Sequence, residues 1–191
     1  MSKIFYFDCE TTGLDSSKNG IIQIAFSLEI DGKVVEERDI RMKPFKGDII
    51  DSAALEVNGV TIEQIKDFQE PEDAYLEILS VFDEYIDKYD KNDKFFPSGY
   101  NVDFDLNFFS AFWKKASKSK YGVGSYCNWR KLDPLPILYF LVERGDLKLE
   151  NYKLVTVCKH FGIELDNAHD ALSDIRATVE LIKIVKEKFL N

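Results

Sequence analysis

The sequence predicts one α/β domain over residues 1–191, in which a mixed β-sheet that opens as a β-meander is flanked by α-helices. Three observations predict this fold class. Residues 4–7 form a continuous apolar run, typical of a strand buried on both faces. Asp31-Gly32 is a strong hairpin turn between two β-prone segments. After residue 61, apolar residues recur at helical spacing instead.

Four strands are predicted from β-prone runs and turn signals. They cover residues 4–7, 20–30, about 33–42 and 94–100, and Pro97 and Gly99 interrupt the last of them. Because helical sequence separates the third strand from the fourth, we expect a mixed sheet with helices packed around it. Functional residues are then expected at strand ends and helix starts.

The helices are predicted from their start and stop signals. Thr61 can cap a short helix at residues 62–65, and Pro71 precedes an amphipathic helix that reaches residue 89. The residues of this helix expected to face inward are Leu76, Leu79, Val81, Phe82 and Ile86. Further helices are predicted at about 105–117, from Asp133-Pro134 to about 145, from an Asn151 cap to 160, and at 169–189.

The composition is that of a soluble globular protein, with 45 % hydrophobic and 31 % charged residues. No apolar run approaches the roughly 20 residues needed to span a bilayer, so no membrane partner is expected. The N-terminus carries no signal-peptide pattern. Three cysteines without a Cys-x-x-Cys pair argue against a disulfide framework or a zinc site and favour the cytoplasm. The net charge of −9 argues against a protein that coats long duplexes.

The first acidic cluster stands at the end of the first predicted strand. Asp8 and Glu10 are two residues apart, so their side chains point to one face, while Cys9 points the opposite way into packing. The following Thr11-Thr12-Gly13 breaks the strand and opens space beside the two acids. Taken alone, this pair is better explained as exposed charge at a strand edge than as metal ligands.

The second cluster contains Asp105 at a predicted helix entrance, directly after a strand-like segment. Its alternative reading is a first-turn carboxylate that complements the helix dipole. Asp103 is the competing candidate. We prefer Asp105 because Phe104 and Phe108 flank it with apolar mass that would hold it in place.

His169 and Asp174 form the third cluster, five residues apart. On one continuous helix this step turns the side chains by about 140°, so they would diverge. Both can face one site only if His169 lies in the loop or a loosened first turn, and residues 166–168 supply suitable cap chemistry. A histidine near metal-bound water can take its proton, because imidazole titrates near neutral pH. The alternative is an exposed histidine at a helix start.

Carboxylates with open oxygen positions are the ligands that Mg²⁺ and Mn²⁺ prefer. Two such ions about 4 Å apart can clamp a scissile phosphate and stabilise both the attacking and the leaving oxygen. The three clusters together therefore predict an enzyme that cleaves phosphodiester bonds.

In this order, the clusters resemble the motifs of the DEDD-type 3′→5′ exonuclease superfamily, in its histidine-bearing DEDDh (DnaQ-like) subgroup. The matching stretches are residues 7–14, 101–105 and 169–174, with similar intermediate stretches at 21–25 and 58–61. The resemblance implies a ribonuclease H-like fold. It implies that Asp8 bridges two Mg²⁺ or Mn²⁺ ions, that Glu10 and Asp174 complete the site, that Asp105 holds the second ion through water, and that His169 is the general base.

The resemblance also implies a substrate site. Its residues are Thr11, Thr12, Gly13 and Leu14 around the terminal nucleotide, and Asn101 and Phe104 along the groove. The implied reaction releases nucleoside 5′-monophosphates from single-stranded or frayed 3′ ends, with DNA favoured in a proofreading or repair role. The alternatives are an exoribonuclease that trims RNA 3′ ends and a docking subunit with a DNA polymerase as its partner.

The stretch 114–131 is the only basic concentration and it is interleaved with aromatic residues. Such a pattern is typical of a path for a single strand with stacking platforms. A solvated helix end above packed aromatic residues is the alternative, which we slightly favour.

Overall fold

The computed structural model describes residues 2–117, 121–165 and 170–189. Its sheet has the strand order β3-β2-β1-β4. The strands β1 (Lys3–Thr11), β2 (Ile21–Ile30) and β3 (Lys33–Arg41) are antiparallel neighbours, whereas β4 (Phe96–Ser98) is parallel to β1. The prediction of a mixed sheet that opens as a meander is confirmed.

The two neighbours of β1 differ in length. The strand β2 pairs with β1 along its whole length, from Lys3 to Thr11, with a register shift between Glu10 and Thr11. The strand β4 pairs only with the segment from Ile4 to Tyr6. The carboxyl half of β1 therefore extends past the end of β4, and this half carries the first acidic cluster.

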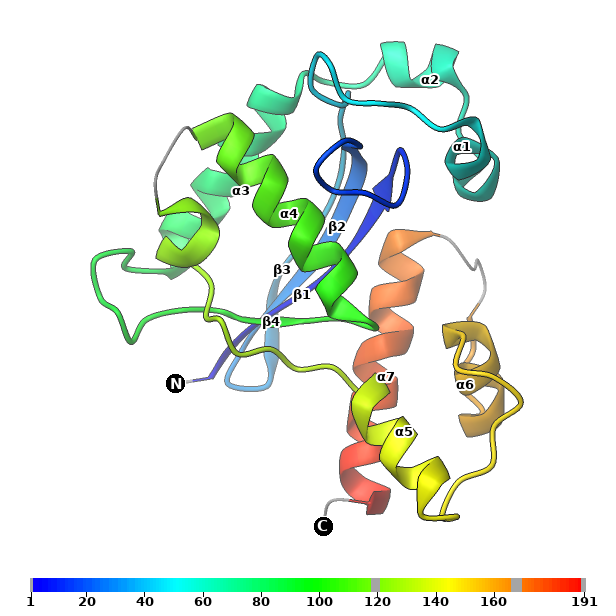
Figure 1. Ribbon diagram of the computed structural model, residues 1–191. Coiled ribbons are helices and arrows are strands. Elements are labelled where there is room, and N and C mark those ends of the chain that lie inside the picture. The colour runs from blue at the N-terminus through cyan, green and yellow to red at the C-terminus, as the bar shows by residue number, and fades with distance from the viewer. Residues whose placement is uncertain (1, 118–120, 166–169, 190–191) are drawn as a thin grey trace.

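Helices cover both faces of the sheet (Figure 1). The helices are α1 (Ser52–Asn58), α2 (Ile62–Lys66), α3 (Pro71–Tyr85), α4 (Val102–Ser117), α5 (Leu135–Glu143), α6 (Leu154–Phe161) and α7 (Ala171–Phe189), with a 3₁₀ helix at Gly122–Ser125. Helices α3 and α4 lie on one side of the sheet and α7 on the other, with α5 and α6 beside α7. Within the described residues, no helix has both the length and the apolar character that a membrane crossing requires.

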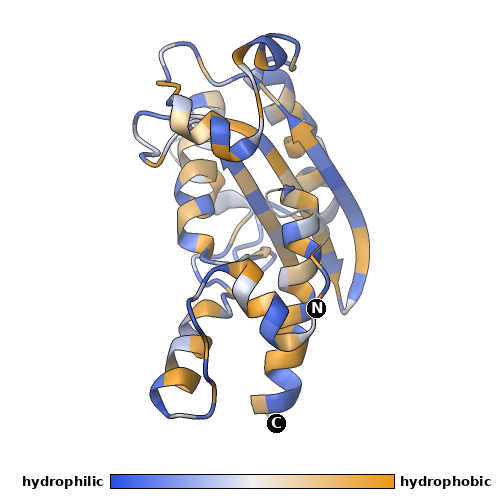
Figure 2. Cartoon of the chain, turned by 90° about the vertical axis from the view of Figure 1, so that its right-hand side faces the viewer, coloured by the Kyte–Doolittle hydropathy of each residue, from blue (hydrophilic) through white to orange (hydrophobic). Residues whose placement is uncertain are grey.

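The alternation of side chains along β1 explains why this strand is buried on both faces. Phe5 and Phe7 join the core under α3 and α4, where the ring of Phe5 meets that of Phe82 edge-on at 5.1 Å. Tyr6 packs on the other face against Ile175 of α7. In Figure 2, apolar residues accordingly recur along the strands and along the helices that pack on them.

Helix starts followed the predicted signals only in part. Thr61 and Gln64 form a reciprocal capping box, and Pro71 occupies the first turn of α3, as predicted. Asn151 is not the cap of α6, because the N-cap is Lys153 and the Asn151 side chain only accepts the Lys153 N–H at 3.0 Å. Helix α4 begins three residues earlier than expected, and α1 was not predicted.

The prediction for α3 was wrong at Leu76 and at the end of the helix. The helix ends at Tyr85, and Leu76 is 58 % exposed. The buried stripe of α3 runs through Ala74, Ile78, Val81 and Phe82, which are spaced by four, three and one residues. Leu76 lies off that stripe and faces solvent.

We predict that Phe82→Ala lowers the free energy of unfolding by about 3–5 kcal/mol, because it empties the centre of the aromatic core. The matched control on the same helix is Leu76→Ala, which should change it by less than about 0.5 kcal/mol because the side chain is exposed. Urea unfolding of both variants measures the difference. Equal losses would contradict this assignment of the inward face.

Candidate active site

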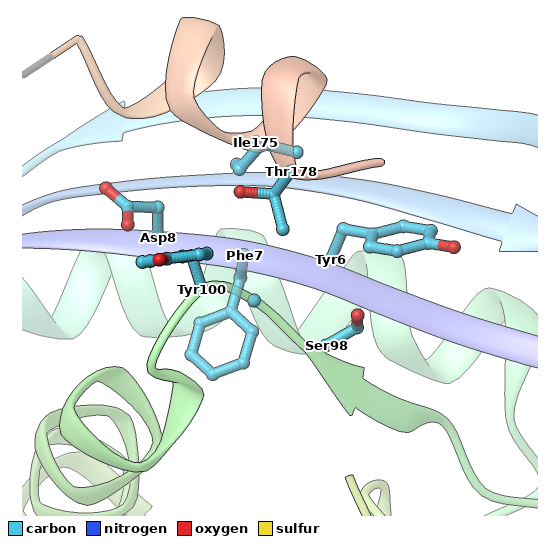
Figure 3. A pocket seen from close by; sticks show the side chains of 8 residues that line it. Tyr6, Phe7, Asp8, Ser98, Tyr100, Ile175 and Thr178 are labelled. Atoms are coloured by element: carbon cyan, nitrogen blue, oxygen red, sulfur yellow. The ribbon is translucent and has the colours of Figure 1, made fainter. Parts of the chain in front are cut away.

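Asp8 and Glu10 lie on the face of β1 that α7 covers. Phe7 and Cys9 point into the core on the opposite face. Asp8 and Glu10 alternate with them along the strand and therefore point to α7. Figure 3 shows Asp8 on the same side of the strand as Ile175 and Thr178 of α7, with the Phe7 ring on the other side. The predicted inward packing of Cys9 is confirmed, since its side chain is buried.

Asp105 reaches β1 from the other side, through a tight connection between β4 and α4. A Cβ atom on Gly99 would lie 3.0 Å from the Phe7 carbonyl oxygen, so the two backbones approach closely there. Asn101 follows with a φ of 58°, in the left-handed region that non-glycine residues seldom adopt. Helix α4 then carries Asp105 to the extended half of β1, where its Oδ1 accepts the Cys9 N–H at 3.0 Å.

The choice between the two aspartates of the second cluster is clear in the structure. Asp105 is 4 % exposed and bonded to the backbone of β1. Asp103 is exposed and forms an ion pair with Lys131. Only Asp105 therefore faces the acids of β1.

Asp174 approaches from the first turn of α7. Ala171 and Ile175 pack this turn against Tyr6, and the Asp174 N–H donates to the Asp170 carbonyl at 3.0 Å. His169, together with the predicted cap at 166–168, lies outside the described residues.

These carboxylates are close enough to perturb one another. Burial, and then the charges of Asp105, Glu10 and Asp174, hold the pKa of Asp8 well above its ordinary value. Burial and the charges of Asp174 and Asp170 raise the pKa of Glu10 to about 7. Burial raises the pKa of Asp105 to about 7 as well, although the hydrogen bond from Cys9 opposes the rise. The structure thus brings the four predicted acids together at the carboxyl end of β1.

The donor set fits a hard divalent cation. In the described part of the chain, Asp8, Glu10 and Asp105 form no ion pair with lysine or arginine, so their charge is uncompensated by protein. Carboxylate oxygens are the ligands that Mg²⁺ and Mn²⁺ prefer. Among residues 2–117, 121–165 and 170–189, no three acidic, cysteine or histidine side chains are close enough to hold one ion as they stand.

The loop after β1 is fastened by its own threonines. The Thr11 hydroxyl donates to the Gly13 carbonyl at 2.7 Å. The Thr12 hydroxyl donates to the Ile49 carbonyl at 2.7 Å and accepts the Gly20 N–H at 2.9 Å. Both threonines are buried, whereas Leu14 is 85 % exposed. The two hydroxyls therefore shape the loop, and Leu14 is the side chain that it presents to solvent.

Asn19 was missed from the sequence although it organises this loop. Its Nδ2 donates to the carbonyls of Thr12 at 3.2 Å and Ile49 at 2.9 Å, and to Asp51 Oδ2 at 3.2 Å. A Cβ atom on Gly13 would lie 2.3 Å from the Asn19 side chain, which explains the glycine. A single asparagine in a polar loop is typical of any turn, so no sequence signal could have found it.

The predicted groove residues lie at the start of α4. Asn101 is exposed, and the Phe104 ring is partly buried against Phe108 at a centroid distance of 5.0 Å. Both are therefore placed on the α4 side of the acids.

The basic and aromatic stretch divides into two kinds of residue. Trp113 and Tyr126 are buried in the core, as the packing alternative expected. Trp129 is 83 % exposed, with the Arg130 guanidinium 5.4 Å from its ring centroid. Lys115 pairs with Asp48, and residues 118–120 lie outside the described ranges.

Comparison with known sequences gives matches along almost the whole chain. The RNase T family model, described as Exonuclease, matches residues 5–182. The DNA polymerase III PolC-type of Bacillus cereus is 27 % identical over 186 residues, which are 95 % of this chain and 11 % of that protein. That of Halalkalibacterium halodurans is 29 % identical over 187 residues, 97 % of this chain and 12 % of that protein. The chain thus spans about a ninth of the length of these relatives.

Solved structures show the same fold. Escherichia coli Exonuclease I in complex with a dT13 oligonucleotide superposes with a TM-score of 0.79 at 22 % identity, over 97 % of this chain and 41 % of that one. Exonuclease I from Methylocaldum szegediense gives a TM-score of 0.80 at 18 % identity, over 100 % and 42 %.

The expected ribonuclease H-like fold is therefore confirmed, with its mixed four-stranded sheet and flanking helices. The family model extends over most of the chain and includes the strand and the helices that carry the four acids. By its sequence and its fold, the chain belongs to the DEDD-type exonuclease family.

Proposed function

We propose that the domain, over residues 1–191, is a metal-dependent 3′→5′ exonuclease that hydrolyses the terminal phosphodiester bond of a nucleic-acid strand and releases nucleoside 5′-monophosphates. The observation that carries this proposal is the convergence of Asp8, Glu10, Asp105 and Asp174, which raise one another's proton affinity. A scaffold has no need of four converging carboxylates, whereas phosphodiester hydrolysis by bound divalent ions requires them.

In the proposed mechanism Asp8, Glu10, Asp105 and Asp174 would hold two Mg²⁺ or Mn²⁺ ions. Bound there, the ions would supply positive charge to the attacking and leaving oxygens. The Cys9 N–H fixes Oδ1 of Asp105 against the backbone of β1. His169 takes the proton of the attacking water as general base.

The terminal nucleotide is proposed to lie against the loop after β1. Leu14 offers exposed apolar surface there for a base, while Thr11 and Thr12 hold the loop backbone in place. Gly13 belongs to the same loop, where the side chains of Asn19 and Asp51 leave no room for a Cβ atom. Asn101 and Phe104 are proposed to contact the strand from the α4 side.

DNA is the favoured substrate because the relatives are DNA polymerases and the structural neighbour was solved with a DNA oligonucleotide. The same likeness favours a proofreading or repair role and association with a polymerase. Trimming of RNA is the second candidate. It differs in how the pocket accommodates the 2′-hydroxyl.

We predict that Asp8→Ala, Asp105→Ala and Asp174→Ala each abolish Mg²⁺-dependent degradation, because each removes a ligand. Asp103→Ala should retain most of the activity, since this exposed aspartate faces Lys131 instead. The measurement is the degradation rate of end-labelled single-stranded DNA, duplex DNA and short RNA, each with Mg²⁺, Mn²⁺ or chelator. It reports both the metal dependence of the reaction and the preferred substrate. Full activity of the Asp8 variant would remove the proposed mechanism.

His169→Ala is expected to lower kcat by roughly 10²–10⁴, the usual loss for a general acid or base. His160→Ala is the matched control, because this residue lies at the carboxyl end of α6. Single-turnover kinetics with a labelled oligonucleotide compare the two variants. An undiminished kcat for the His169 variant would exclude it as the base.

The raised pKa values also predict how stability depends on pH. In the unfolded chain Glu10 and Asp105 lose their protons near their ordinary pKa values of 4.5 and 3.8, but in the folded protein only near 7. Between about pH 4 and pH 7 the folded state therefore binds more protons than the unfolded chain does. The free energy of unfolding accordingly falls as the pH rises through this window. Divalent ions should reverse the loss, because they bind only the folded site.

Thermal unfolding measures this effect with and without Mg²⁺. The matched variant is Asp8→Asn, which removes one charge and should flatten the fall in Tm without metal. A Tm that does not respond to millimolar Mg²⁺ at pH 7.5 would contradict the proposed site.

A further inference from the structure

Asp133 stands outside the acid cluster but bonds to the framework that carries it. Its Oδ1 accepts the N–H groups of Asn101 at 3.3 Å and Leu135 at 2.9 Å, and its Oδ2 accepts that of Val102 at 3.1 Å. Val102 begins α4 and Leu135 begins α5. One carboxylate therefore accepts the first N–H group of both α4 and α5, and its negative charge complements the positive end of both helix dipoles.

The residues before Asp133 fasten the same junction. The Leu132 N–H donates to the Pro97 carbonyl at 2.9 Å, and the Leu132 carbonyl accepts the Gly99 N–H at 3.3 Å. Lys131 forms its ion pair with Asp103 in the first turn of α4. The segment 131–133 thus holds β4, the turn after it and the start of α4 together.

This turn is the part of the backbone that needs holding. Asn101 has a positive φ, a conformation that persists in non-glycine residues only when the surrounding structure enforces it. Gly99 lies against the Phe7 carbonyl, so the turn cannot shift toward β1. The Asp133 carboxylate accepts the Asn101 N–H itself and the next N–H along the chain.

Asp105 is one helical turn beyond this contact. A helix moves as a rigid element over so short a distance, so the direction of the first turn of α4 sets where the Asp105 carboxylate lies. We propose that Asp133 is a positioning residue, which aims Asp105 at the Cys9 N–H and so at the acids of β1. The consequence for metal binding rests on the proposed function, whereas the aim of Asp105 does not.

The test compares Asp133→Ala with Asp93→Ala. Asp93 is a matched control because its carboxylate likewise accepts a backbone N–H, from Asp87 at 2.8 Å, and contacts Lys3 at 2.5 Å at the opposite end of β1. The direct readout is hydrogen exchange of the Cys9 amide by NMR. We expect several-fold faster exchange in Asp133→Ala and wild-type exchange in Asp93→Ala, although both substitutions lower the Tm.

The second readout is Mn²⁺ affinity by calorimetry, measured without substrate. It should weaken by about 10–100-fold in Asp133→Ala, the usual effect of losing a group that orients a metal ligand, and stay unchanged in Asp93→Ala. With DNA, kcat should fall while KM stays near the wild-type value. Asp133→Asn keeps one acceptor oxygen and should recover part of the Cys9 protection, and it replaces the alanine variant if that does not fold.

Wild-type Cys9 exchange in a folded Asp133→Ala protein, or in Asp133→Asn where the alanine variant does not fold, would overturn the proposal. A wild-type chain that binds no Mn²⁺ would refute the proposed function instead, and the amide exchange would still decide the role of Asp133.

Discussion

The fold holds several carboxylates together at the carboxyl end of β1 against their mutual repulsion. Burial and neighbouring negative charge both raise the pKa of Asp8, so the protein by itself favours the protonated, uncharged form. No lysine or arginine in the described ranges forms an ion pair with Asp8, Glu10 or Asp105, so no cationic side chain there offsets their charge. The other features of the site can be understood as means of sustaining this arrangement.

Three elements reach the site independently. The strand β1 supplies two acids on one face, α7 covers that face, and α4 arrives at the edge that the short β4 leaves uncovered. The hydrogen bond from Cys9 to Asp105 joins the strand to α4 directly, and Asp133 secures the turn from which α4 starts. The aromatic core under β1, centred on Phe5 and Phe82, fixes the strand from the opposite face.

The net charge of −9 agrees with an enzyme that holds a strand end rather than one that coats a duplex. The structure also narrows what the basic and aromatic stretch can do. Trp113 and Tyr126 are core residues, and Lys115 is engaged by Asp48. Trp129 and Arg130 form an exposed aromatic and basic pair in that stretch.

The sequence by itself determined the meander, the mixed sheet and the pairing of Asp8 with Glu10 on one face, because strand alternation and turn chemistry are local. It also favoured Asp105 over Asp103, through the flanking Phe104 and Phe108. Only the tertiary structure decided that Leu76 faces solvent and that Lys153, not Asn151, occupies the N-cap position of α6. The roles of Asn19 and Asp133 likewise came only from the structure, since their partners lie up to 32 residues away along the chain and a hydrogen bond over that distance leaves no local pattern.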